Sequence, residues 1–151
     1  MHDLVFEGAT VIDGSGQAAR TADVGIKNGL IAEIGRITGQ SQQRVDASGA
    51  WLTPGFVDIH THFDGQASWD QTFSPSVHHG VSTVVFGNCG VGFAPLRSGD
   101  KQRAVDDLIS LMEGVEDIPG AALAEGVTFD WQSFPEYMDA LDRMPHSLDF
   151  L

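Results

Sequence analysis

The chain has 151 residues, a formal net charge of -13, and a composition that is 42% hydrophobic and 19% charged. There is enough apolar chain for a globular core, and the acidic balance argues against a nucleic-acid partner, whose phosphates attract Lys and Arg. No apolar run approaches the about 20 residues of a membrane span, Met1 opens no visible secretory signal, and Cys89 is the one cysteine, which together favour a cytoplasmic protein without an internal disulfide.

The first fifty residues have the pattern of β structure. Residues 4–13 are rich in β-forming side chains and run into a glycine-containing turn. Residues 23–27 and 30–34 flank Asn28-Gly29, a strong signal of a hairpin because both positions tolerate positive φ. A short β segment is expected at residues 44–47. We therefore predict a small antiparallel β domain over residues 1–52.

From residue 53 onward the pattern predicts a strand, a short helix and a second strand. Residues 56–62 predict a strand, and the apolar run 81–86 predicts a parallel strand that is buried on both faces. Between them, Ser74–Gly80 predicts one or two helical turns, with Ser74 as N-cap and Gly80 in the left-handed conformation at the end.

Further helices and one more strand follow along the chain. Residues 105–112 have apolar side chains at helical spacing, and residues 133–141 predict a helix that begins at a capping box of Ser133 and Glu136. Residues 147–151 begin to alternate like a strand. Alternating strands and helices predict an α/β fold with parallel strands over residues 53–151.

Two histidines and the cysteine are the candidate metal ligands. His60 and His62 are two residues apart on a predicted strand, so their imidazoles project from the same face, at the end where parallel α/β folds carry their sites. Cys89 follows the next strand, and if the two strands are parallel neighbours about 4.8 Å apart, its sulfur reaches the same site. The alternatives are a pair of surface histidines and a cysteine that is buried as a small apolar side chain or acts as a nucleophile.

Two aspartates are candidates for supporting roles. Asp58 is on the same strand face as the histidines and would orient an imidazole, or it would be an ordinary exposed carboxylate. Asp64 follows in the next loop, where it would contact metal-bound water or substrate, or simply form a turn.

The segment from Pro54 to Gln66, which ends its strand in the His-x-His pair, resembles the amidohydrolase superfamily. The segment Gly80–Gly90, with its Gly-Asn-Cys-Gly sequence, narrows the resemblance to the D-aminoacylase branch, the N-acyl-D-amino-acid deacylases, in which a cysteine after the second strand joins the metal site. Residues 112–119 and 129–137 also resemble this branch. Phe63 departs from the pattern, because some D-aminoacylases have an aspartate there.

The resemblance implies a fold and an activity. The fold would be the N-terminal part of a metal-dependent (β/α)₈ TIM-barrel hydrolase, preceded by a small β domain of the composite β-sandwich type, with the barrel incomplete in this chain. One or two zinc ions would be bound with the help of His60, His62 and Cys89. The enzyme would hydrolyse N-acyl-D-amino acids to a carboxylate and a free D-amino acid. The other ligands and the general-base aspartate are expected beyond Leu151, so the chain alone is expected to be inactive.

Two other functions stay open at this point. One is hydrolysis of a cyclic amide of the hydantoin or dihydropyrimidine type, which Cys89 disfavours because those relatives usually bridge their metals with a modified lysine. The other is a non-catalytic metal-binding fragment. The expected partner is a small-molecule N-acyl amino acid, with no nucleic acid and no membrane, and the sequence leaves the oligomeric state open.

Overall fold

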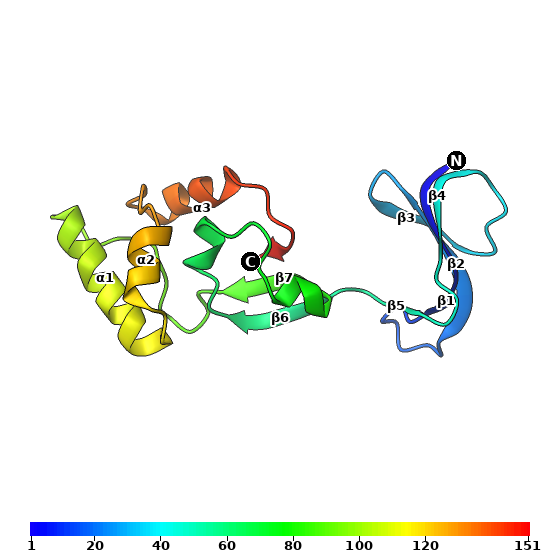
Figure 1. Cartoon of the computed structure of the whole chain (residues 1–151), viewed down its shortest axis with the longest axis horizontal. Coiled ribbons are helices and arrows are strands. Elements are labelled where there is room, and N and C mark those ends of the chain that lie inside the picture. Colours follow the sequence, from blue (N-terminus) through cyan, green and yellow to red (C-terminus); the bar gives the residue numbers. More distant parts are fainter. The chain divides into compact units, whose positions relative to one another are not determined.

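The computed structural model describes all residues, 1–151, and the chain divides into two compact units, Met1–Pro54 and Gly55–Leu151 (Figure 1). The first unit is a five-stranded sheet without helices. Its strand order is β3-β2-β1-β4, and β5 also pairs with β1. The strands are β1 His2–Val11, β2 Arg20–Lys27, β3 Leu30–Gly35, β4 Ser41–Asp46 and β5 Trp51–Leu52.

The predicted hairpin is present in the first unit, but the sheet is mixed and not wholly antiparallel. Asn28 and Gly29, both at positive φ, connect β2 to β3, which pair antiparallel. β1 pairs antiparallel with β2 but parallel with β4 and β5. The prediction of a purely antiparallel sheet is therefore wrong, because residue patterns indicate which segments form strands and leave the direction of non-neighbouring strands to the connections between them.

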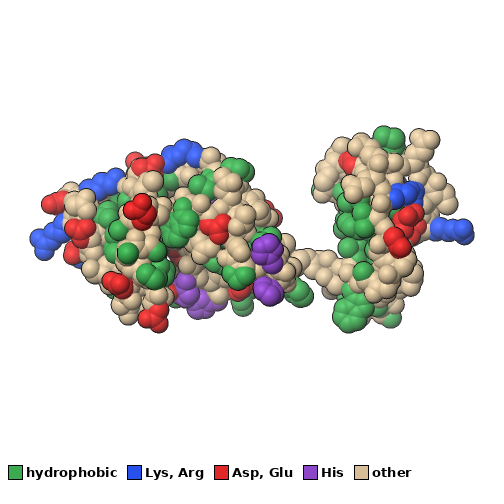
Figure 2. Space-filling model, viewed as in Figure 1, with side chains coloured by type: hydrophobic (Ala, Val, Ile, Leu, Met, Phe, Trp, Pro, Cys, Tyr) green, Lys and Arg blue, Asp and Glu red, His purple; other side chains and the backbone are tan.

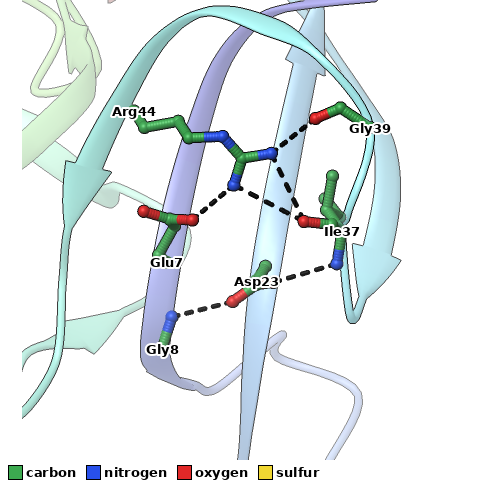
Figure 3. A network of polar contacts seen from close by, with 6 residues as sticks. All are labelled: Glu7, Gly8, Asp23, Ile37, Gly39 and Arg44. Carbon is green, nitrogen blue, oxygen red and sulfur yellow. Dashed lines mark hydrogen bonds and ion pairs between the residues drawn. The ribbon is translucent and has the colours of Figure 1, made fainter.

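A network of polar contacts holds the connection between β3 and β4 against the sheet (Figure 3). The two carboxylate oxygens of Asp23 accept the backbone N–H groups of Gly8 and Ile37, each at 2.9 Å. The Arg44 guanidinium pairs with the Glu7 carboxylate and donates to backbone carbonyl oxygens of the connecting loop. These contacts link β1, β2 and β4, and they fix the returning chain beside β1 in the parallel direction.

The first unit buries few side chains and exposes one apolar face. Val5, Ala9 and Val24 are almost fully buried within the sheet. Ile31 is 65% exposed and Ile34 is 40% exposed, and they line an open apolar cavity of about 220 Å³. Figure 2 shows hydrophobic side chains gathered on this unit.

The second unit is a parallel sheet with helices between and after its strands. The strand order is β6-β7-β8, and both pairings are parallel, as the alternating pattern predicted. The elements in chain order are β6 Phe56–Thr61, the 3₁₀ helices η1 Gln66–Ser68 and η2 Ser76–His79, β7 Val81–Phe86, α1 Lys101–Glu116, α2 Gly120–Gly126, α3 Phe134–Asp142 and β8 Asp149–Phe150.

Two local predictions in this unit need correction. The short helix before β7 begins at Ser76, so its N-cap is Pro75 and not Ser74, whereas Gly80 ends it with φ 80° as predicted. β7 is not buried on both faces, because only Val84 is fully buried. The apolar side chain of Ile59 on the edge strand β6 is 73% exposed. No element of the second unit packs over that part of the sheet, so the burial expected for an interior strand is not reached.

The helices pack around a core of aromatic and aliphatic side chains. The capping box predicted at the start of α3 is present, with the Ser133 hydroxyl and the Glu136 carboxylate both engaged. Trp131 is 2% exposed and donates its indole N–H to the Phe93 carbonyl oxygen at 2.8 Å. Leu123 of α2 and Tyr137 of α3 complete the same core. The longest helix, α1, has 16 residues, and none of the helices is long and apolar enough to cross a membrane.

Candidate metal site

The end of β6 presents the two histidines on one side of the sheet. Thr61 lies between them in sequence, is 8% exposed, and donates its hydroxyl to the Val85 carbonyl oxygen of β7 at 2.9 Å. Because neighbouring strand residues point to opposite faces, inward-facing Thr61 places His60 and His62 together on the other side. Their ring centroids are 5.3 Å apart.

A tight loop after β7 brings the cysteine to the same place. Gly87 and Gly90 have φ values of 73° and 86°, so the chain turns sharply on either side of Asn88 and Cys89. The Asn88 side-chain amide donates to the Ile59 carbonyl oxygen at 2.7 Å, which ties this loop to β6. As a result, Cys89 Sγ is 4.0 Å from His62 Nδ1.

The three side chains meet the geometric needs of a divalent transition metal. One ligand atom each from His60, His62 and Cys89 lies within 4.8 Å of the other two. Zinc bonds of about 2.0–2.3 Å in a tetrahedral arrangement separate ligand atoms by about 3.3–3.6 Å, so small side-chain movements suffice. Two imidazoles and a thiolate are donors that zinc prefers, and all three residues are exposed, which leaves the site open to a further ligand.

The two aspartates from the sequence analysis occupy different surroundings. Asp58 accepts the backbone N–H of His60 at 3.3 Å, so its carboxylate contacts the main chain and no imidazole contact is present. Asp64 is 6% exposed, and burial raises the pKa of its carboxyl above the ordinary value, against hydrogen bonds from backbone N–H groups that include Gly87. A methyl group added at Gly87 would lie 3.3 Å from Asp64 Oδ1, so the cysteine loop packs directly on this carboxylate.

Sequence reasoning missed one acidic residue at the site. Glu116, the last residue of α1, pairs with His62 Nδ1, and its other oxygen is 3.7 Å from Cys89 Sγ. Its side chain is 7% exposed, whereas the His62 side chain is 43% exposed. The sequence did contain an indication, because Glu116 is four residues after the buried Met112. Residues four apart lie on the same face of a helix, so Glu116 places a charged side chain on the buried face.

Proteins similar to this chain include deacylases of amino-acid derivatives. Residues 43–148 match the model of the amidohydrolase family. The chain is 42% identical over 150 residues to an N-acyl-D-aspartate deacylase of Alcaligenes xylosoxydans xylosoxydans. The aligned region covers 99% of this chain and 27% of that protein.

Two solved structures share the fold over nearly the whole chain. A D-aminoacylase described as having a binuclear metal centre matches with a TM-score of 0.77 and 32% identity, over 99% of this chain and 29% of its own. The N-acyl-D-glutamate deacylase of Bordetella bronchiseptica, solved with zinc and a phosphonate mimic of the tetrahedral intermediate, matches with a TM-score of 0.67 and 31% identity, over 99% of this chain and 28% of its own.

These matches bear out the expected α/β architecture with a small sheet domain before it, and the barrel is incomplete in this chain. The chain spans less than a third of the length of each of these relatives. The family model covers well over half of the chain. The chain therefore belongs to the amidohydrolase family, and within it resembles the D-aminoacylases and the N-acyl-D-amino-acid deacylases.

Proposed function

We propose that this chain forms part of a zinc-dependent enzyme that hydrolyses the amide bond of N-acyl-D-amino acids. The observation that carries the proposal is the meeting of His60, His62 and Cys89, whose ligand atoms lie within 4.8 Å of one another. The names of the relatives support the substrate class, since deacylases of N-acyl-D-aspartate and N-acyl-D-glutamate are among them. We further propose that residues 1–52 form the small β domain and that residues 53–151 supply the first strands and helices of the barrel.

His60, His62 and Cys89 are the residues that would hold the metal. When bound, zinc would supply Lewis-acid polarisation of the amide carbonyl and a lowered pKa for a water molecule. One or two ions fit the proposal, in keeping with the zinc complex and the binuclear centre of the solved relatives. The exposed position of the three side chains leaves room for a substrate carbonyl to approach.

The neighbouring acids would support this site without taking part in bond breaking. Asp58 would fix the strand end through the backbone of His60. Asp64 would keep the Gly87–Gly92 loop, and with it Cys89, against β6, because its carboxylate accepts a hydrogen bond from the backbone N–H of Gly87. We propose that the general-base aspartate is supplied by a part of the enzyme that follows Leu151.

The charge of the chain agrees with a small-molecule substrate. A net charge of -13 disfavours phosphate-rich partners. A cytoplasmic location is part of the proposal, supported by the single cysteine, which would keep its thiol reduced for metal binding in that compartment.

The test is hydrolysis of N-acetyl-D-amino acids by the full-length gene product. Matched L-enantiomers and a hydantoin serve as comparison substrates. We expect turnover of the D-enantiomers that a chelator abolishes and zinc restores. Preferential turnover of the hydantoin would favour the cyclic-amide alternative, and no chelator-sensitive turnover of either class would contradict the proposal.

Variants at Cys89 test the ligand role in the same protein. Cys89→Ala is expected to lose most bound zinc and most activity, because it removes the thiolate donor. Cys89→Ser is the matched control for folding, since it preserves the size of the side chain. Unchanged zinc content in Cys89→Ala, measured by metal analysis, would remove the cysteine from the site.

A further inference from the structure

The carboxylate of Glu116 is buried at the C-terminal end of a helix, where the helix dipole destabilises a negative charge. It is the last residue of α1, which ends at Asp117 in the left-handed conformation. The C-terminus of a helix carries partial negative charge, so a carboxylate there is unfavourable. Burial of a charge is also unfavourable unless the charge is paired. Contacts with another part of the chain must offset both effects.

The partners of Glu116 are two of the three candidate metal ligands. One carboxylate oxygen pairs with His62 Nδ1, and the other lies 3.7 Å from Cys89 Sγ. His62 is the one basic side chain paired with it. Packing of the helix in the core holds Glu116 in position. Met112, one helical turn earlier on the same side, is 2% exposed and belongs to the core.

We propose that Glu116 is a positioning residue for the metal site, a step that rests on the proposed function. It accepts the Nδ1 proton of His62, which leaves Nε2 as the unprotonated nitrogen and fixes the plane of the imidazole. Carboxylates that contact the second nitrogen of a ligand histidine orient the ring and increase its donor strength. The mutually close ligand atoms belong to His60, His62 and Cys89, and Glu116 contacts two of these three side chains.

Three variants of the full-length protein test this role. Glu116→Ala removes the acceptor, and Glu116→Gln keeps an oxygen of the same size without the charge. Asp107→Ala is the matched control, because Asp107 is an exposed acid on the same helix. Circular dichroism checks that each variant is folded, and competition with a chromophoric chelator measures zinc affinity.

We expect Glu116→Ala to weaken zinc binding by about 10- to 100-fold, as loss of such partners commonly does. Glu116→Gln should lose less, and Asp107→Ala should bind zinc like the parent. Equal zinc affinity in the parent and in Glu116→Ala would overturn the positioning role. The role would also be overturned if Asp107→Ala weakened zinc binding as much as Glu116→Ala, because the effect would then come from the change in net charge.

A second measurement needs no metal. Long-range ¹H–¹⁵N spectra of the imidazoles, recorded above the titration range of histidine, report which nitrogen carries the proton. We expect the His62 proton on Nδ1 in the parent and a shift toward the Nε2 tautomer in Glu116→Ala. If the parent binds no zinc, the proposed metal site fails, and the tautomer still decides whether Glu116 orients His62. An unchanged tautomer in Glu116→Ala would refute the orientation.

If Glu116→Ala does not fold, the isosteric Glu116→Gln variant is tested by the same two measurements. An amide retains an acceptor but no charge, so a reduced preference for the Nδ1 tautomer together with weaker zinc binding would support the role. Parent-like values for both would overturn it.

Discussion

The phenol of Tyr137 should contribute measurably to stability through one hydrogen bond. Tyr137 is 3% exposed and donates to the Asp64 carbonyl oxygen at 2.6 Å. Burial and the charge of Asp64 raise the pKa of Tyr137, so the hydroxyl remains a donor across the accessible pH range. Tyr137→Phe removes only the oxygen, and the ring keeps its packing on Trp131, with centroids 4.9 Å apart. The Asp64 carbonyl then loses its buried partner, which costs about 1–3 kcal/mol of unfolding free energy.

The assay is urea unfolding followed by tryptophan fluorescence, since buried Trp131 touches Tyr137 and reports on the second unit. The matched control is Thr128→Val, which removes an exposed hydroxyl that contacts Asp130 Oδ1 at 3.3 Å. The control should change stability by no more than about 0.5 kcal/mol. If Tyr137→Phe falls within the same limit, the buried Tyr137–Asp64 hydrogen bond does not make the expected contribution to stability.

Three further changes have expected outcomes. Asp23 accepts two backbone N–H groups that lower its pKa below the ordinary 3.8, so its contribution to stability is complete above that pH and is lost as the pH falls below it. The Asp23→Asn variant should therefore be less stable at neutral pH, and its stability should change less between pH 5 and the acid range. Equal pH profiles of stability for the variant and the parent, measured by circular dichroism, would contradict this. Ser133→Ala should cost about 1 kcal/mol in urea unfolding through loss of the helix cap, and an unchanged midpoint would show that the cap is not needed. Gly55→Ala places a methyl group in a clash with the Ser82 side chain and should cost about 1–3 kcal/mol. Ser82→Gly in the same chain should restore stability, and an additive double mutant would rule out the clash.

Local chemistry accounts for the parts of the fold that the sequence predicted. Asn28-Gly29 needs no information beyond two residues that accept positive φ. The capping box at Ser133 is likewise set within four residues. By contrast, the parallel direction of β4 depends on contacts made by Arg44 and Asp23 across the sheet, and α2 escaped prediction because a seven-residue segment that begins and ends with glycine has little helical propensity of its own.

The candidate site divides in the same way. His60 and His62 could be paired from strand periodicity alone, and Cys89 could be added because parallel neighbours end at the same edge. Glu116 comes from the end of a 16-residue helix whose direction of return no sequence pattern specifies. Asp58 shares the strand periodicity of the histidines, yet its carboxylate contacts the His60 backbone.

Three locally unfavourable features of the second unit lie at the candidate metal site. Gly87 and Gly90 impose a sharp turn, Glu116 buries a carboxylate at the unfavourable end of a helix, and Cys89 exposes a thiol that usually prefers burial. Natural sequences are locally consistent with their folds except where function requires otherwise. Each of these features lies at or beside the side chains of His60, His62 and Cys89, which is the place where the proposed function puts a cation.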